Sequence, residues 1–308
     1  MSLAYLSHSD CGRHDTGWNH AEHVGRLRAI PRALRHDFEL FDAIQHRESR
    51  HATVDELALA HDAAYVARVR DLAAAGGGEL DPDTRVSEGS WDAATAATGA
   101  VLDGIDLALS GEATRSFCAV RPPGHHALRD AGMGFCLFGH VGIGALYARQ
   151  RHGLGRVLVV DWDVHHGNGT QALVEHDAGV RFVSMHQWPW YPGTGAADDR
   201  GPHGTVWNVP MGPNLPRARY LDALAAAVHA ATDGWTPELV LISAGFDCLA
   251  GDPLGAFTLE LDDVTTMTRL LVDGAERWCG GRVVSSLEGG YDPVRLGEAC
   301  VTHLRALR

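Results

Sequence analysis

The sequence has no long apolar segment and no cluster of positive charge. No uncharged apolar run approaches the roughly 18 residues that a membrane-spanning helix needs, and the N-terminal segment MSLAYLSHSD lacks the basic and apolar regions of a secretory signal. Acidic residues outnumber basic ones by 39 to 26, and no run of five or more Lys or Arg occurs. We therefore predict a soluble, cytoplasmic protein that binds neither membranes nor nucleic acid directly.

Cysteine is also sparse and scattered. The six cysteines stand at positions 11, 118, 136, 248, 279 and 300 and form no C-x-x-C pair. This spacing is typical of a protein in a reducing compartment and not of a disulfide scaffold, which agrees with a cytoplasmic location.

Short apolar runs alternate with Ala- and Leu-rich stretches along the 308 residues. Runs that are apolar throughout are typical of strands in a parallel sheet covered on both faces. We expect such strands at 116–120, 157–160, 180–185, 239–243 and 283–287. We expect helices at 93–109, 140–151, 219–232 and 262–278. The alternation predicts an α/β fold with one doubly wound domain spanning residues 1–308.

Polar segments follow all five predicted strands. In open α/β sheets the ligand site lies outside the carboxyl ends of the strands, so we expect the functional site there. The segments are RPPGHH at 121–126, DWDVHHGNG at 161–169, HQWPWYPG at 186–193, AGFD at 244–247 and EGGY at 288–291.

A metal site is the first expectation from these segments. Asp161, Asp163 and His165 are spaced by two, so in an extended chain they project to one face. Carboxylates that face each other beside a buried strand repel unless a cation compensates them. Asp163 and His165, with Asp247 from another strand end, would supply three ligands and leave a fourth position open, as in catalytic zinc sites. This hard ligand set also suits Fe²⁺, Mn²⁺ or Co²⁺, and the alternative is a solvated loop.

The tandem His125–His126 is the second expectation. Two prolines and a glycine precede the pair and stiffen its loop, and beside a metal the two imidazoles would act as general base and general acid. Asp161 and Asn168 are the obvious partners that set their tautomers. Without a metal site, the pair would be an ordinary surface feature.

Three aromatic residues complete the predicted site. Tyr291 follows two glycines and could donate a hydrogen bond to a polarised carbonyl, or it could be an ordinary turn tyrosine. Phe135, in the segment Gly134-Phe135-Cys136, and Tyr191 could form the walls of a narrow slot, although most aromatic residues belong to the core.

These motifs resemble those of the histone deacetylase and acetylpolyamine amidohydrolase superfamily, in particular its class II branch and bacterial relatives. The resemblance rests on DWDVHHGNGTQ at 161–171, RPPGHH at 121–126 and SAGFD at 243–247, and it extends from HAEHVGRL at 20–27 to LEGGY at 287–291. It implies the arginase/deacetylase fold, with a mostly parallel eight-stranded sheet and helices on both faces.

The resemblance also implies roles for the site residues. Zinc would be bound by Asp163, His165 and Asp247. His125 would pair with Asp161 and His126 with Asn168, where class I relatives have Asp, and Tyr291 stands at the position of the catalytic tyrosine. Potassium would bind to Asp161, to backbone carbonyls of Asp163 and His165, and to Ser184 with Met185.

The same resemblance concerns the substrate. Arg26 would lie below the acetyl pocket, and Asp83 would hold the substrate backbone at the rim. The Asp-Pro-x-Gly loop at 252–255 has Leu254 where acetylpolyamine deacetylases have a glutamate. We therefore predict hydrolysis of the acyl amide of N-acyl-lysine in a peptide or protein, or of a related small acylated amine. An acetylpolyamine deacetylase and a silent acyl-lysine binding module are the alternatives, and a homo-oligomer is possible.

Overall fold

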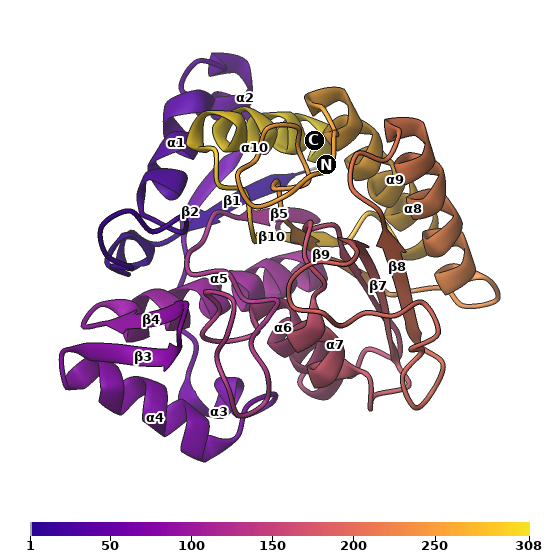
Figure 1. Ribbon diagram of the computed structural model, residues 1–308. Coiled ribbons are helices and arrows are strands. Elements are labelled where there is room, and N and C mark those ends of the chain that lie inside the picture. Colours follow the sequence, from indigo (N-terminus) through magenta and orange to yellow (C-terminus); the bar gives the residue numbers. More distant parts are fainter. Residues whose placement is uncertain (1) are drawn as a thin grey trace.

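Eight strands form one sheet in the order β2-β1-β5-β10-β9-β6-β7-β8, and every pairing is parallel (Figure 1). The computed structural model describes residues 2–308. The strands are β1 (Leu3–Ser7), β2 (Gln45–Glu48), β5 (Arg115–Cys118), β6 (Val157–Asp161), β7 (Val180–Gln187), β8 (Val206–Met211), β9 (Leu239–Ala244) and β10 (Val283–Leu287). A separate antiparallel hairpin consists of β3 (Gly77–Asp81) and β4 (Thr84–Ser87).

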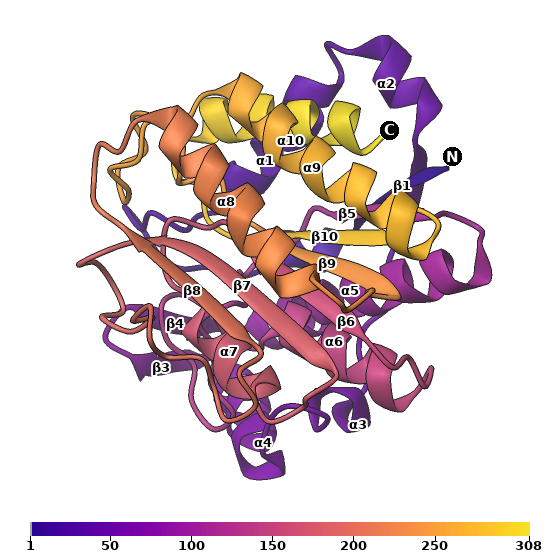
Figure 2. The same ribbon diagram turned by 90° about the vertical axis from the view of Figure 1, so that its right-hand side faces the viewer.

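Helices cover both faces of the sheet, as Figure 2 shows. One apolar core contains residues of α1 (Gly25–Leu34), α2 (Phe38–Ala43), α8 (Arg217–Thr232), α9 (Leu261–Cys279) and α10 (Pro293–Leu307). The other contains residues of α3 (Val54–Leu57), α4 (Ala63–Ala74), α5 (Ser90–Ser110), α6 (His140–Gln150) and α7 (Asn168–Val174). Among the described residues, no helix combines the length and the apolar character needed to cross a membrane.

Alternating residues of each central strand enter the two cores. In β6, Leu158 and Val160 pack into the first core, whereas Val157 and Val159 pack into the second, and all four are fully buried. Because successive side chains of a strand point to opposite faces, a strand with helices on both sides must be apolar at every position. This is the physical reason for the uninterrupted apolar runs of the sequence.

The five predicted strands and the four predicted helices are confirmed, with ends that differ by a few residues. The predicted doubly wound parallel arrangement is confirmed as well. Among the strands of the eight-stranded sheet, the prediction missed β1, β2 and β8. Two of these, β2 and β8, are the edges of the sheet, and β2 (QHRE) alternates half-buried and exposed residues. A strand with a partner on one side only does not need an apolar residue at every position.

Local signals define the ends of α9. Glu260 and Asp263 form a reciprocal capping box at its start, and Gly280 ends it with a left-handed φ of 65°. The box satisfies two backbone N–H groups of the first turn, and glycine adopts the left-handed conformation without steric cost.

Candidate active site and metal centre

The carboxyl ends of β6, β9 and β10 lie side by side. Asp161 of β6 is in register with Ser243 of β9, and Ala244 of β9 is in register with Leu287 of β10. The polar segments that follow these strands therefore meet at one edge of the sheet. This is the crevice in which open α/β folds bind their ligands.

Asp163, His165 and Asp247 converge at this edge. Their potential ligand atoms all lie within 4.8 Å of one another, and all three residues are buried. The Nδ1 atom of His165 lies 3.0 Å from Asp163 Oδ1 and 3.3 Å from Asp247 Oδ2. The structure thus brings together the three residues that the sequence predicts as metal ligands.

Backbone N–H groups hold the two carboxylates in place. Val164 N donates to Asp247 Oδ1 at 2.8 Å, and Gly289 N donates to Asp163 Oδ2 at 2.8 Å. A side chain at Gly289 would clash, because its Cβ would lie 2.0 Å from Asp247 Oδ2. A Cβ at Gly245 would likewise lie 2.2 Å from Asp163 Oδ2. Glycine at both positions lets the backbone approach the carboxylates closely enough to orient them.

The electrostatics of this cluster fit a bound cation. Asp247 Oδ2 is buried and has no hydrogen-bond partner among the described residues, although His165 lies nearby. Burial and the charge of Asp163 raise the pKa of Asp247 to about 7. Burial would lower the pKa of His165, but its contacts with the two carboxylates outweigh burial and raise it to about 10. The site thus stabilises positive charge, and an unsatisfied carboxylate oxygen is suited to a metal ion.

A second group of possible ligands fits a cation less well. Its members are His125, Cys136 and Glu288, all buried. Burial raises the pKa of the Cys136 thiol well above its usual value, so the thiol stays protonated, whereas the thiolate is the metal-binding form. His125 Nδ1 already contacts Asp161 Oδ2 at 3.0 Å.

A third group of possible metal ligands, which is partly exposed, is also less suited to a cation. It consists of His8, Asp10 and His51. His8 Nδ1 accepts a hydrogen bond from the backbone N of Asp10 at 3.1 Å, so this lone pair is already in use. Of these groups, the one at Asp163 is therefore the best candidate for a metal.

The two histidines of the tandem have different partners. His125 Nδ1 lies 3.0 Å from Asp161 Oδ2, and His126 Nδ1 lies 2.7 Å from Asn168 Oδ1. Burial opposes the charge of His125, but Asp163 and Asp161 outweigh it and raise the pKa of His125 well above its usual value. Burial and the neighbouring His125 lower the pKa of His126 well below it. The pair thus presents one neutral and one protonated imidazole near pH 7, and only the neutral one can accept a proton.

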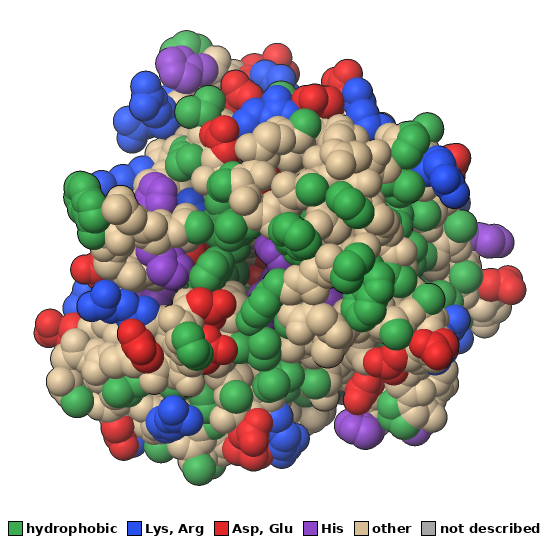
Figure 3. Space-filling model, in the orientation of Figure 1, with side chains coloured by type: hydrophobic (Ala, Val, Ile, Leu, Met, Phe, Trp, Pro, Cys, Tyr) green, Lys and Arg blue, Asp and Glu red, His purple; other side chains and the backbone are tan. Residues whose placement is uncertain are grey.

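A pocket of about 250 Å³ reaches His165 of the candidate metal site. Figure 3 shows a hollow on this side of the molecule, with histidine atoms inside it and hydrophobic side chains around it. Most of the predicted substrate-binding residues meet in this pocket. Its lining consists of Asp83, His126, Gly134, Phe135, His165, Trp190, Tyr191, Pro253, Leu254 and Tyr291.

Two pairs of rings in the pocket stand edge to face. The Tyr191 ring is 5.1 Å from that of His126, and the Phe135 ring is 5.9 Å from that of Tyr291, both T-shaped. Such pairs bury apolar area and hold rigid walls. Phe135 has a positive φ of 69°, and its N–H donates to Thr84 Oγ1, so the hairpin β3–β4 supports this wall.

Tyr291 lines the pocket, and Arg26 lies behind its ring. The Arg26 guanidinium carbon lies 4.8 Å from the centre of the Tyr291 ring, and Arg26 is fully buried. Burial raises the pKa of the Tyr291 phenol well above its usual value, so its hydroxyl remains a proton donor. Arg26 does not line the pocket of about 250 Å³.

The residues predicted to bind potassium lie on the neighbouring strands β6 and β7 and in the segment that follows β6. Ser184 of β7 is in register with Asp161, and both Ser184 and Met185 are fully buried. Ser184 Oγ lies 3.0 Å from His186 Nδ1. Asp161 Oδ1 accepts from Asp163 N at 3.0 Å, which joins this region to the candidate metal site.

Two carboxylates of the site were not assigned a role from the sequence. Glu288 Oε2 accepts from Gly124 N at 2.6 Å and from His125 N at 3.1 Å, so it fixes the turn that bears the histidines. Asp252 Oδ2 accepts from Tyr291 N at 2.7 Å. Glu288 follows a buried strand, as Asp163 does, and this same signal could have identified it.

Comparison with known proteins agrees with this geometry. The histone deacetylase domain matches residues 20–307 of the chain. The chain belongs to this family. A histone deacetylase-like amidohydrolase of Pseudomonas aeruginosa is 38% identical over 86% of this chain and 72% of its own length. The polyamine deacetylase HDAC10 of Homo sapiens is 39% identical over 82% of this chain and 40% of its own length.

The solved structures include a close match. The crystal structure of the HDA15 HD domain superposes with a TM-score of 0.93 at 34% identity, covering 99% of this chain and 88% of that one. The expected arginase/deacetylase fold and the expected family are therefore confirmed. As a histone deacetylase family member, the chain is a hydrolase with a deacetylase function.

Proposed function

We propose that the chain is a zinc-dependent deacylase that hydrolyses the acyl amide of N-acyl-lysine to a free amine and a carboxylate. One observation supports this most strongly: the tandem His125–His126, with unlike partners, lies beside Asp163 and His165. These two residues form one group with Asp247, whose Oδ2 has no hydrogen bond among the described residues. A base, an acid and a cation site at one pocket are what amide hydrolysis requires.

Asp163, His165 and Asp247 would hold the metal ion. A divalent ion held there supplies a Lewis acid, which polarises an amide carbonyl and makes a water molecule more acidic. Zinc is the first candidate, and the two carboxylates also accept Fe²⁺, Mn²⁺ or Co²⁺. We further propose K⁺ at Asp161, at the carbonyls of Asp163 and His165, and at Ser184 and Met185.

His126 acts as the general base in this mechanism. Its lowered pKa keeps the imidazole neutral near pH 7. Nδ1–H donates a hydrogen bond to Asn168 Oδ1, so Nε2 is left to take a proton from the attacking water. His125, paired with the carboxylate of Asp161, keeps its proton and stabilises the charge that develops beside it. Protonated His126 then delivers its proton to the leaving amine.

Tyr291 stabilises the oxyanion. Attack on the amide carbon produces a tetrahedral species with a negative oxygen, and the protonated phenol donates a hydrogen bond to it. Asp252 and Arg26 hold the backbone and the ring of Tyr291.

The proposed substrate is an acylated amine at the end of a long, unbranched side chain. Gly134, Phe135 and Tyr191 would enclose an acyl-lysine side chain, and Asp83 at the mouth would accept hydrogen bonds from the substrate backbone. Leu254 presents no negative charge to a second ammonium group, which favours acyl-lysine. An acetylpolyamine remains the second candidate, because a polyamine deacetylase is among the similar proteins. The bound amide would lie above Arg26.

We also propose that residues 1–308 act as one catalytic domain in the cytoplasm, alone or as a homo-oligomer, without direct contact to nucleic acid. The substrate class is tested with acetyl-, propionyl-, lactyl- and trifluoroacetyl-lysine peptides beside acetylated polyamines, with activity expressed per bound metal ion.

The metal site is tested by Asp247→Ala. This variant should lose both bound metal, measured by mass spectrometry, and activity on every substrate. Asp177→Asn is the matched control, since Asp177 pairs with Arg149 away from the pocket. Full metal content in Asp247→Ala would rule out the assignment.

A further inference from the structure

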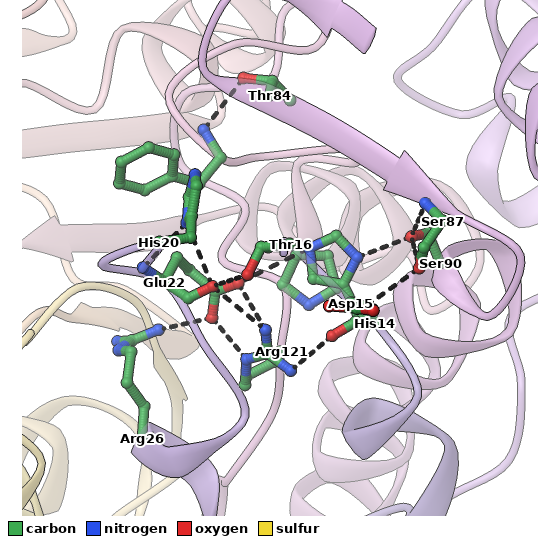
Figure 4. A network of polar contacts seen from close by, with 12 residues as sticks. His14, Asp15, Thr16, His20, Glu22, Arg26, Thr84, Ser87, Ser90 and Arg121 are labelled. Carbon is green, nitrogen blue, oxygen red and sulfur yellow. Dashed lines mark hydrogen bonds and ion pairs between the residues drawn. The ribbon is translucent and has the colours of Figure 1, made fainter. Parts of the chain in front are cut away.

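A fully buried carboxylate lies between two buried arginines next to the active site (Figure 4). Glu22 Oε1 accepts from Arg26 Nη1 at 3.0 Å and from Arg121 Nε at 2.5 Å. Glu22 Oε2 accepts from Arg121 Nη2 at 2.7 Å. All three side chains have no exposed surface. The segment that precedes α1 thus brings one carboxylate into contact with the first turn of α1 and with Arg121, 99 positions away.

Arg26 connects this carboxylate to the loop that bears Tyr291. Arg26 Nε donates to the carbonyl of Gly290 at 2.6 Å, and Arg26 Nη2 donates to the carbonyl of Glu288 at 2.5 Å. Its guanidinium also lies against the Tyr291 ring. Any movement of Arg26 is therefore passed to the backbone and to the ring of the proposed oxyanion donor.

Arg121 begins the loop that bears the histidine pair. Besides Glu22, its guanidinium donates to the carbonyls of Cys11 at 3.3 Å and His14 at 3.1 Å, and to the carbonyl of Glu22 at 3.4 Å. Arg121 therefore keeps several backbone acceptors if the Glu22 carboxylate is removed. Arg26 has Glu22 as its side-chain partner, and its carbonyl acceptors all belong to the Tyr291 loop.

Glu22 supplies the negative charge that this cluster needs. His14 Nε2 lies 3.6 Å from Glu22 Oε2, but burial lowers the pKa of His14 to about 4, so this imidazole is neutral at pH 7. Burial would raise the pKa of Glu22, yet the charges of Arg121 and Arg26 outweigh it and lower the pKa to about 2. One carboxylate thus offsets part of the charge of two buried cations, and removing one partner from such a group is strongly destabilising.

We propose that Glu22 is a positioning residue that holds the Tyr291 hydroxyl in the catalytic pocket through Arg26. It contacts neither the pocket nor the metal ligands, and it acts by fixing the guanidinium on which residues 288–291 rest. This inference rests on the proposed function for its kinetic readout. By contacting both Arg121 and Arg26, Glu22 fixes the loop of the histidine pair relative to the loop of Tyr291.

The test is Glu22→Gln, which keeps the shape of the side chain and removes its charge. The kcat on an acetyl-lysine peptide should fall by about 10- to 100-fold, because small misplacements of a catalytic group have effects of this size. The loss should be clearly smaller on a trifluoroacetyl-lysine peptide, whose electrophilic carbonyl depends less on Tyr291. Equal losses on both substrates would overturn the proposal.

A double-mutant cycle sharpens the result. If Glu22 acts through Tyr291, the variant Glu22→Gln/Tyr291→Phe should be only slightly slower than Tyr291→Phe alone, because the hydroxyl to be positioned is already absent. Losses that multiply would mean that Glu22 acts elsewhere.

Asp263→Asn is the matched control. Asp263 is also buried, and its Oδ2 accepts from Arg217 Nε at 2.5 Å, but it does not line the pocket. This variant should lower the melting temperature and change kcat on both substrates by the same factor. Its loss of kcat should multiply with that of Tyr291→Phe.

Two further measurements cover the remaining outcomes. If Glu22→Gln does not fold, Glu22→Asp keeps the charge but is too short to contact both arginines as Glu22 does, and the same kinetic ratios apply to it. If the wild type hydrolyses neither substrate, the proposed function fails. Crystal structures of the wild type and the variant then decide the positioning role. A displaced Arg26 and Tyr291 would support it, and an unchanged Tyr291 would overturn it.

Discussion

The amide oxygen Oδ1 of Asn168 lies 2.7 Å from Nδ1 of His126. An amide oxygen fixes the tautomer of the imidazole without adding a negative charge, whereas the neighbouring His125 faces the carboxylate of Asp161. Burial and the charge of His125 lower the pKa of His126, whereas the carboxylates of Asp163 and Asp161 raise that of His125. Because Asn168 adds no negative charge to oppose the first effect, His126 is the neutral imidazole of the pair and the proposed base.

Asn168→Asp should therefore change the pH dependence. A carboxylate at this position favours the charged imidazole and raises the pKa of His126 by about one unit or more. Because the base must be neutral, the acidic limb of kcat/KM should move to higher pH. The measurement is kcat/KM on an acetyl-lysine peptide from pH 5 to 9. The uncharged Asn168→Ser should leave the limb in place, and an unmoved limb in Asn168→Asp would exclude His126 as the base.

Leu254→Glu should shift the choice of substrate. Leu254 lines the pocket beside Trp190, whose Nε1 donates to the Leu254 carbonyl at 2.9 Å. A carboxylate there attracts the second ammonium of a polyamine by about 1–2 kcal/mol at a partly exposed mouth, or roughly 5- to 30-fold. The ratio of kcat/KM for acetylspermidine-like amines to that for acetyl-lysine peptides should rise accordingly. Leu254→Gln controls for size, and an unchanged ratio would remove Leu254 from the account of specificity.

His303 should make the fold sensitive to acid. Its imidazole is fully buried between Thr268 Oγ1, at 2.7 Å, and Ser285 Oγ, at 2.8 Å. Burial lowers the pKa of His303 to about 3, from 6.5 for the free side chain. Between these values the unfolded chain binds a proton that the folded chain does not, so the free energy of unfolding falls as the pH drops below about 6.5.

His303→Gln removes this titration. Between pH 7 and pH 5 the wild type should lose about 2 kcal/mol more unfolding free energy than the variant, as measured by urea unfolding at both pH values. Equal losses in the two proteins would show that His303 does not titrate in this way.

The sequence was most informative where charged residues directly follow a buried, apolar strand. A strand such as 157–161 is apolar up to its last residue because helices cover both of its faces, and the charged residues at its end stand out for this reason. Asp163, His165 and Asp247 could be grouped from the order of residues alone, since parallel strands end at one edge.

Contacts between distant segments could not be predicted in this way. Glu22 and Arg121 are 99 positions apart, and the apolar pattern does not indicate that they meet. The hairpin β3–β4, which places Asp83 and supports Phe135, is half-exposed and lacks an apolar run. The edge strand β2 (QHRE) likewise lacks an apolar run, whereas the apolar run of β8 (VWNVPM) is interrupted by Asn208 and contains Pro210.

The central claim is that Tyr291 stabilises an oxyanion while His126 activates water, and one set of rates tests it. The measurement is kcat of Tyr291→Phe and His126→Ala on acetyl- and trifluoroacetyl-lysine peptides at saturating metal. Tyr291→Phe should keep its metal and lose about 10²–10³ in kcat on the acetyl substrate, with a clearly smaller loss on the trifluoroacetyl substrate. His126→Ala should lose heavily on both, since even an electrophilic carbonyl needs an activated water. Equal losses of Tyr291→Phe on the two substrates would contradict the account, because its hydroxyl would then not be the oxyanion donor.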